Sequence, residues 1–237
     1  MSIAENLQRV CERIARAAEA AGRRHEEITL VGVTKYVDAQ QAAELAAAGC
    51  TDLGESRPQE LWKKVAEIEQ AGPSSAPAIR WHLVGHLQRN KVHRTLPLVL
   101  LIHSVDSERL LAAINEARAA EGDSGGPVDV LLEVNTSGEA AKHGLAPDDV
   151  ARLLDVAPRY PRVYILGLMT MAALEGGLGV AAQNFASLRE LRDRLRPAAP
   201  NCALNELSMG MSADFEVAIR EGATMVRIGS LLWEHTV

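Results

Sequence analysis

Residues 28–49, ITLVGVTKYVDAQQAAELAAAG, contain one strand pattern followed directly by one helix pattern. The apolar, β-branched run from Ile28 to Lys35 predicts a buried strand. Asp38 then stands in N-cap position with Gln41 three residues later, and Gly49 is placed to end the helix. This strand–helix unit is the pattern that the rest of the chain repeats.

Seven further strands are predicted, at a short run leading into residues 54–56 and at 79–85, 99–104, 128–134, 163–168, 203–209 and 225–228. Each is followed by a helix pattern or by the chain end, which predicts a parallel sheet with right-handed crossovers. An opening helix places Leu7, Val10, Cys11 and Ile14 on one face. We therefore expect an α/β fold, a (βα)8 TIM barrel with an extra N-terminal helix, in a single domain spanning residues 1–237.

The alternative is an open doubly wound sheet, but no G-x-G-x-x-G follows the first strand. The net charge of −6 argues against nucleic-acid or anionic-membrane partners. The three cysteines are far apart and outside any C-x-x-C pair, so we expect neither a disulfide framework nor a metal site. Because we find neither a leader pattern nor an apolar run near the ~20 residues that span a bilayer, we expect a cytoplasmic protein.

Functional residues of a (βα)8 barrel lie at the C-terminal ends of the strands, with a phosphate site often formed after strands seven and eight. This rule selects Lys35, Ser56, His82, His103, Asn135, Met169, 208–212 and 227–230. The two histidines lack metal-ligand spacing, so we expect them to pack or hydrogen-bond. Met169 is also consistent with a core position. The basic segment 88–94 lacks interleaved aromatic residues and is interpreted as a solvated helix face.

Lys35 and the last two loops suggest an aldehyde- and phosphate-binding site. Burial of the Lys35 amine in the barrel mouth would favour its neutral, nucleophilic form, although a solvated lysine at the strand end fits equally well. Ser212 is placed to cap the next helix. The same position, together with Gly229 and Ser230, would direct backbone N–H groups at an anion.

Six blocks of the sequence carry a resemblance to a known family: 31–35 (VGVTK), 54–60 (GESRPQE), 81–91 (WHLVGHLQRNK), 167–169 (GLM), 207–212 (LSMGMS) and 226–230 (VRIGS). Over almost its whole length the chain resembles the pyridoxal phosphate homeostasis proteins (YggS/PROSC type). The resemblance implies the fold type III barrel of the alanine racemase N-terminal domain, with pyridoxal 5′-phosphate (PLP) as cofactor.

The resemblance also assigns residues. It implies that Lys35 forms a Schiff base with PLP and that Arg227 faces the pyridine nitrogen. It also implies that Ser212, Gly229 and Ser230 hold the phosphate. Ser208 and Met169 would line the same site. A guanidinium only donates hydrogen bonds, so that nitrogen stays unprotonated and the cofactor is a weaker electron sink than one paired with a carboxylate.

A racemase of this fold needs a second acid/base, which an additional β domain supplies. The chain stops seven residues after Ser230, so we expect no such domain, and strand alternation should turn Tyr36 away from Lys35. We therefore expect no catalytic residue, and a monomer that carries or buffers PLP in vitamin B6 and amino-acid homeostasis, with PLP-dependent apo-enzymes as recipients. The alternatives are a weak amino-acid racemase and a Schiff-base aldolase acting on a sugar phosphate.

Three positions depart from the family pattern. Many members have Asn where Ser56 stands, a second lysine where Val37 stands, and an ending Phe-Gly-x-Arg where this chain has Trp233-Glu234-His235. We expect the contacts at these positions, and the cover over the cofactor, to differ accordingly.

Overall fold

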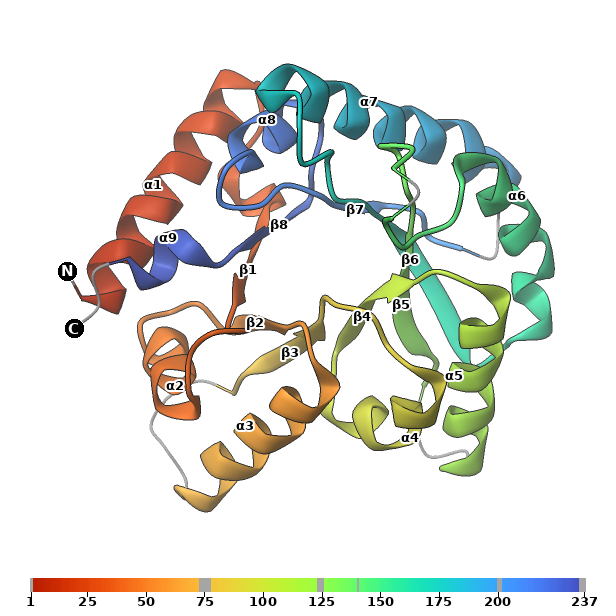
Figure 1. Ribbon diagram of the computed structural model, residues 1–237, viewed down its shortest axis with the longest axis horizontal. Helices are drawn as coiled ribbons and strands as arrows, with labels where there is room; N and C mark the ends of the chain where they lie inside the picture. Colours follow the sequence, from red (N-terminus) through yellow and green to blue (C-terminus); the bar gives the residue numbers. More distant parts are fainter. Residues whose placement is uncertain (1, 73–77, 123–125, 140, 200–201, 235–237) are drawn as a thin grey trace.

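The computed structural model describes residues 2–72, 78–122, 126–139, 141–199 and 202–234. Eight parallel strands close into a barrel in sequence order, and helices surround it (Figure 1). The strands are β1 Thr29–Val33, β2 Asp52–Glu55, β3 Arg80–Leu83, β4 Leu101–Val105, β5 Val128–Glu133, β6 Val163–Met169, β7 Glu206–Ser208 and β8 Met225–Ile228. The predicted barrel is confirmed.

The helices follow the strands as predicted, and the N-terminal helix precedes them. Their bounds are α1 Ile3–Ala20, α2 Ala39–Ala47, α3 Pro58–Gln70, α4 Val92–Thr95, α5 Glu108–Ala120, α6 Pro147–Val156, α7 Gly177–Leu195, α8 Phe215–Arg220 and α9 Ser230–Trp233. The short helix α9 was not predicted. Most of the expected surface loops at 72–78 and 122–126 lie outside the described residues.

The boundaries of α2 show how the sequence sets these elements. The Asp38 carboxylate accepts a hydrogen bond from the Gln41 backbone N–H at 2.8 Å, and the Gln41 side chain accepts from the Asp38 N–H at 3.4 Å. This capping box satisfies amide groups that the first helical turn leaves unpaired. Gly49 follows the helix with φ of +113°, in the left-handed region that glycine adopts without steric cost.

Helix α1 lies outside the barrel beside β1 and β8 and packs on α8 and α9 (Figure 1). Leu7, Val10 and Ile14 are buried as predicted, but Cys11 is exposed, so its assignment to the apolar face was wrong. The Asn6 side chain donates to two carbonyl groups of the chain end, those of Leu232 at 3.1 Å and Glu234 at 2.9 Å. The two ends of the described chain are therefore hydrogen-bonded to each other.

The main hydrophobic core lies between the barrel and its helices, and a smaller cluster of Leu101, Leu131 and Met169 is separate from it. The buried polar and charged side chains of the described residues include Asp52, His82, His103, Ser208 and Arg227. Among the described residues, no helix combines the length and the apolar character that crossing a membrane requires.

Candidate cofactor site at the barrel mouth

The closure of the barrel brings together three segments that are distant in sequence. Strand β1 pairs with β8, where Gly32 lies opposite Ile228, and β8 pairs with β7, where Met225 lies opposite Ser208. The residues that follow these three strands therefore share one side of the mouth. They include Lys35 and the segments 209–212 and 229–230, while Ser208 ends β7 and Arg227 lies within β8. Apart from Met169, these segments contain every residue that the resemblance assigns to the cofactor.

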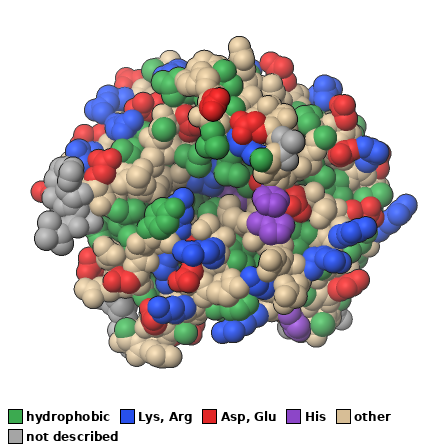
Figure 2. All heavy atoms as spheres, in the orientation of Figure 1, with side chains coloured by type: hydrophobic (Ala, Val, Ile, Leu, Met, Phe, Trp, Pro, Cys, Tyr) green, Lys and Arg blue, Asp and Glu red, His purple; other side chains and the backbone are tan. Residues whose placement is uncertain are grey.

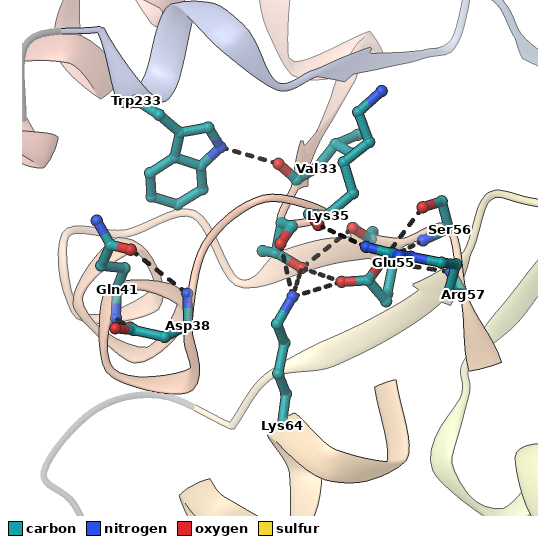
Figure 3. Close-up of polar contacts among 11 residues, drawn as sticks. Val33, Lys35, Asp38, Gln41, Glu55, Ser56, Arg57, Lys64 and Trp233 are labelled. Carbon is teal, nitrogen blue, oxygen red and sulfur yellow. Dashed lines mark hydrogen bonds and ion pairs between the residues drawn. The ribbon is translucent and has the colours of Figure 1, made fainter. Parts of the chain in front are cut away.

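Lys35 lies in a turn at the rim and is exposed. Strand β1 ends at Val33, not at Lys35, because the Val37 N–H bonds to the Thr34 carbonyl at 3.1 Å and closes a tight turn. Of the two positions considered for this lysine, the structure therefore shows the solvated one. The Lys35 side chain points away from the buried side chains beneath the turn (Figure 3).

Tyr36 lies beside Lys35, contrary to the prediction. The Lys35 Nζ is 4.7 Å from the centre of the Tyr36 ring, and Tyr36 is 83% exposed. Strand alternation would have separated the two side chains, but both residues belong to the turn, where alternation does not apply. The aromatic ring therefore contacts the cation at the rim.

A buried ion pair lies directly beneath this turn. Lys64 Nζ donates to Glu55 Oε2 at 2.5 Å and to the Thr34 carbonyl at 2.6 Å (Figure 3). The other Glu55 oxygen accepts from the backbone N–H of Ser56 at 2.7 Å and of Arg57 at 3.3 Å. Glu55 thus links the loop after β2 to the residue that precedes Lys35.

Arg57 and Trp233 hold the same turn from two further directions. The Arg57 guanidinium donates to the Lys35 carbonyl at 3.4 Å, and the Trp233 indole N–H donates to the Val33 carbonyl at 2.9 Å (Figure 3). Trp233 was expected only as a departure from the family pattern, and no role was predicted for Lys64 or Glu55. The available signal was the position of Lys64, three residues after Leu61 on the buried face of α3. His235 lies outside the described residues.

The two predicted phosphate loops meet at Ser212. Its hydroxyl accepts a hydrogen bond from the Gly229 backbone N–H at 3.2 Å. Ser212 does not cap α8, because Asp214 is in the N-cap position and its carboxylate accepts from the Met211 N–H at 2.6 Å. Ser230, at the start of α9, is exposed. The loops after β7 and β8 are therefore joined by this hydrogen bond, in which the Ser212 hydroxyl accepts and can still donate its own proton.

Arg227 is buried on β8, and its two terminal nitrogens have different acceptors. NH1 donates to the Ser208 hydroxyl at 2.6 Å, and NH2 donates to the Thr170 carbonyl at 2.9 Å. Burial lowers the pKa of Arg227 to about 10, against the opposing effect of Glu133 and Asp214, so the guanidinium remains charged at neutral pH. Ser208 is completely buried, so it supports Arg227 instead of presenting its hydroxyl at the surface.

The two buried histidines continue this network, as predicted for hydrogen-bonding residues. His103 lies 2.8 Å from Ser208 Oγ through Nδ1, and 2.9 Å from His82 Nδ1 through Nε2. Met169 is 1% exposed and packs against Leu101 and Leu131. Its contact with a cofactor stays a prediction, whereas its core position is confirmed.

Residues after β3, β4 and β5 gather on the other side of the mouth. His86 and His143 stack with ring centres 4.7 Å apart and planes at 17°, and His86 Nδ1 lies 3.4 Å from Asp106 Oδ2. Ligand atoms of these three residues lie within 4.8 Å of one another. The lone pair of an imidazole nitrogen lies in the plane of its ring. Because the two rings are stacked nearly parallel, their lone pairs do not point at a common position, and a shared ion would require one ring to rotate.

Glu133, at the end of β5, is the buried acid of this side. Burial raises the pKa of Glu133, and the nearby Asp106 raises it further, while His143 and Arg227 oppose the change. Histidine and cationic side chains gather around the centre of this face of the molecule (Figure 2). The rim therefore combines donors on the side of β7, β8 and β1 with acids and imidazoles on the side of β3 to β5.

Comparisons with known proteins agree with this architecture. The family model of the alanine racemase N-terminal domain matches residues 5–236. A pyridoxal phosphate homeostasis protein of Aquifex aeolicus is 41% identical over 233 residues, which cover 98% of each chain. One of Pseudomonas aeruginosa is 38% identical over 98% of this chain and 95% of its own.

Solved structures show the same relationship. The structure of PipY of Synechococcus elongatus with PLP bound aligns with a TM-score of 0.82 at 32% identity, covering 98% of this chain and 99% of that one. An alanine racemase of Clostridium difficile shares only the fold, with a TM-score of 0.70 at 18% identity over 57% of its length. The chain therefore belongs to the alanine racemase N-terminal domain family and, within it, to the group whose curated members are called pyridoxal phosphate homeostasis proteins.

Proposed function

We propose that this protein binds PLP at the barrel mouth between β7, β8 and β1, and that it carries or buffers the cofactor. The observation that carries the proposal is the convergence of three PLP-compatible features on one rim. These are a primary amine at Lys35, the donors joined at Ser212 and Gly229, and a buried guanidinium at Arg227. The names of its relatives and the PLP-bound structure of PipY support the same ligand.

Each part of PLP has a complementary group in this site. The phosphate would accept hydrogen bonds from Ser212, Gly229 and Ser230, since a hydroxyl and backbone N–H groups suit a dianion. The pyridine nitrogen would face Arg227. The Lys35 amine would condense with the aldehyde to form a Schiff base, releasing one water, and hydrolysis of the same bond would free the cofactor.

Two features favour a carrier over a catalyst. Arg227 can only donate to the pyridine nitrogen, which leaves the ring a poor acceptor of electrons from a carbanion. Lys35 is exposed, so water that reverses the Schiff base has access to it. We further propose that the protein acts as a cytoplasmic monomer and delivers PLP to apo-enzymes. Light scattering of the purified chain tests the monomer.

The binding test is an absorption spectrum of the protein with added PLP, before and after borohydride. The wild type should show a band that bleaches on reduction and leaves a covalent adduct on Lys35. Lys35→Ala should abolish both. Lys63→Ala is the matched control, because Lys63 is an exposed lysine on α3, outside the site, and should leave both unchanged. A wild type without the band would contradict the proposal and favour the sugar-phosphate alternative.

The carrier role has its own test. The PLP-loaded protein is mixed with a PLP-dependent apo-enzyme, and recovery of that enzyme's activity is compared with recovery from free PLP at the same concentration. We expect activation, together with no measurable racemisation of amino acids by the loaded protein alone. Sustained amino-acid turnover by the loaded wild type, lost in Lys35→Ala, would contradict the carrier role and establish an enzyme.

A further inference from the structure

A continuous line of hydrogen bonds crosses the barrel interior from one end to the other. It begins at Asp52, the first residue of β2, whose Oδ1 lies 2.9 Å from His82 Nε2. His82 Nδ1 lies 2.9 Å from His103 Nε2, and His103 Nδ1 lies 2.8 Å from Ser208 Oγ. Arg227 NH1 completes the line by donating to Ser208 Oγ at 2.6 Å.

When both imidazoles are neutral, the chemistry of the two ends fixes the direction of every bond between them. Arg227 can only donate, and an ionised Asp52 can only accept. His82 must therefore donate through Nε2, and a neutral His82 then accepts at Nδ1. His103 donates to that atom through Nε2 and accepts at its own Nδ1, where the Ser208 hydroxyl donates. All four bonds thus point from Arg227 toward Asp52.

An extra proton on either histidine would break this order. If His82 were charged, its Nδ1–H would donate to His103, and His103 would donate to Ser208. The Ser208 oxygen would then accept from both sides, and its own proton would have no acceptor in the line. A buried donor without an acceptor is costly, so the network favours two neutral imidazoles.

Burial agrees with a neutral His103. Complete burial places the pKa of His103 well below its usual range, and the positive charge of Arg227 acts in the same direction. Burial alone would raise the pKa of Asp52, but hydrogen bonds from His82 and Arg80 outweigh it and lower the pKa below its usual value. Arg80 Nε donates to Asp52 Oδ1 at 2.9 Å from a half-exposed side chain, so the anionic end of the line is itself paired.

We propose that Asp52, His82, His103 and Ser208 are positioning residues for Arg227, which hold its guanidinium in one orientation through a one-way hydrogen-bond chain. NH1 is held by this chain and NH2 by the Thr170 carbonyl, so two independent contacts fix the plane of the group. The inference rests on the proposed function in one respect, namely that Arg227 faces the pyridine nitrogen of PLP. Asp52 then influences the cofactor site from the opposite end of the barrel without touching the ligand.

The first experiment needs no cofactor. Long-range 15N–1H spectra of the wild-type protein at neutral pH report the tautomer of each histidine. We expect His82 and His103 both to carry their single proton on Nε2, with Nδ1 unprotonated. A proton on His103 Nδ1, or a charged imidazole at either residue, would overturn the proposed direction of the chain.

The second experiment tests whether the far end of the chain reaches the cofactor site. Asp52→Asn keeps an oxygen that accepts from His82, whereas Asp52→Leu removes the acceptor. We expect Asp52→Leu to mix the histidine tautomers and weaken PLP binding about tenfold, since a hydrogen bond that orients a charged group is lost. Asp52→Asn should keep the tautomers and bind PLP within about twofold of the wild type.

The matched control is Asp129→Leu. Asp129 is the second residue of β5 and lies near the same end of the barrel. It does not take part in the line of hydrogen bonds from Asp52 to Arg227. We expect the control to leave the histidine tautomers, the PLP affinity and the 15N shift of the bound pyridine nitrogen unchanged, while Asp52→Leu alters all three. Circular dichroism tests whether each variant is folded. If Asp52→Leu does not fold, the histidine tautomers of the wild type and of Asp52→Asn still decide the direction of the hydrogen bonds.

The two possible failures are distinguishable. A folded Asp52→Leu variant with wild-type tautomers and affinity would refute the positioning role, even if PLP binds normally. A wild-type protein that binds no PLP would refute the proposed function. Its histidine tautomers would still show whether the hydrogen bonds run from Arg227 toward Asp52.

Discussion

Lys64 donates a hydrogen bond to Glu55 at 2.5 Å, in an ion pair whose side chains are 5% and 0% exposed. The same ammonium group donates to the Thr34 carbonyl, next to Lys35. A charge this deeply buried is tolerated when it is paired and hydrogen-bonded. This pair therefore supports the turn that presents the proposed PLP-binding amine.

Lys64→Met should destabilise the protein by about 3–5 kcal/mol, because it leaves the Glu55 carboxylate buried without its cation. Urea unfolding at neutral pH measures the change. Adding Glu55→Leu to Lys64→Met removes the unpaired charge and should recover part of the lost stability. The control Lys63→Met alters a neighbouring lysine that is 67% exposed, and should cost at most about 0.5 kcal/mol. Equal effects of the two single variants would contradict the role assigned to the buried pair.

Gly210→Ala should destabilise the loop after β7 and weaken PLP binding. Gly210 has φ of +93°, and an added Cβ would lie 2.5 Å from the Ala218 Cβ and 2.9 Å from the Phe215 Cα. Backbone strain and overlap together should cost roughly 2–4 kcal/mol, measured by urea unfolding.

The matched control for this substitution is Gly179→Ala in α7. Nothing lies within 4 Å of its added Cβ, and alanine is the better helix former, so stability should stay the same or rise slightly. PLP affinity should fall in Gly210→Ala only, because that loop presents Ser212. Normal stability and normal PLP affinity in Gly210→Ala would show that the turn tolerates a side chain.

The buried, neutral His103 should make stability depend on pH in a defined direction. Burial lowers its pKa well below 6.5, so below pH 6.5 the unfolded chain takes up a proton that the native protein does not bind. Stability should therefore fall as the pH falls from about 6.5, by up to about 1.4 kcal/mol per pH unit for this one group. Urea unfolding at several pH values measures the slope.

Two variants separate this contribution from that of other groups. His103→Gln removes the titrating group, so its stability should fall less steeply between pH 6.5 and 4.5 than that of the wild type. His25→Gln alters an exposed histidine and should retain the wild-type slope. Identical slopes for His103→Gln and the wild type would mean that His103 binds a proton equally in both states.

Glu133→Gln should gain stability relative to the wild type as the pH rises. Burial, reinforced by Asp106, raises the pKa of Glu133, so ionising it costs more in the folded state than in the unfolded chain. That cost develops as the pH rises from 4.5 through the folded pKa, and glutamine does not incur it. Unfolding at pH 4.5 and pH 8 measures the difference. Glu116→Gln, on the exposed face of α5, should show no such trend.

The fold could be predicted because its signals are local. The capping residues Asp38 and Gln41 make the predicted hydrogen bonds, and the eighth strand has the predicted bounds, Met225–Ile228. Helix caps and apolar periodicity depend on residues a few positions apart, so a reading along the chain detects them. The residues proposed for the site could also be selected from the sequence, since Lys35 and Ser212 follow strands and Arg227 lies near the end of one, as the barrel rule expects.

The sequence by itself determined that this chain alternates strands and helices eight times, and it predicted that the site residues lie at one end of the barrel. Only the tertiary structure decided which groups pair: Lys64 with Glu55, Ser212 with Gly229, and Asp52 through two histidines with Arg227. These partners come from different strands and helices, and they meet only when the barrel closes in one register. The turn at Lys35 and Tyr36 closes through a local hydrogen bond from Val37 to Thr34, but Trp233 and Arg57 hold it from neighbouring segments. Local periodicity specifies the elements, whereas the pairing of buried polar groups depends on how the closed barrel aligns them.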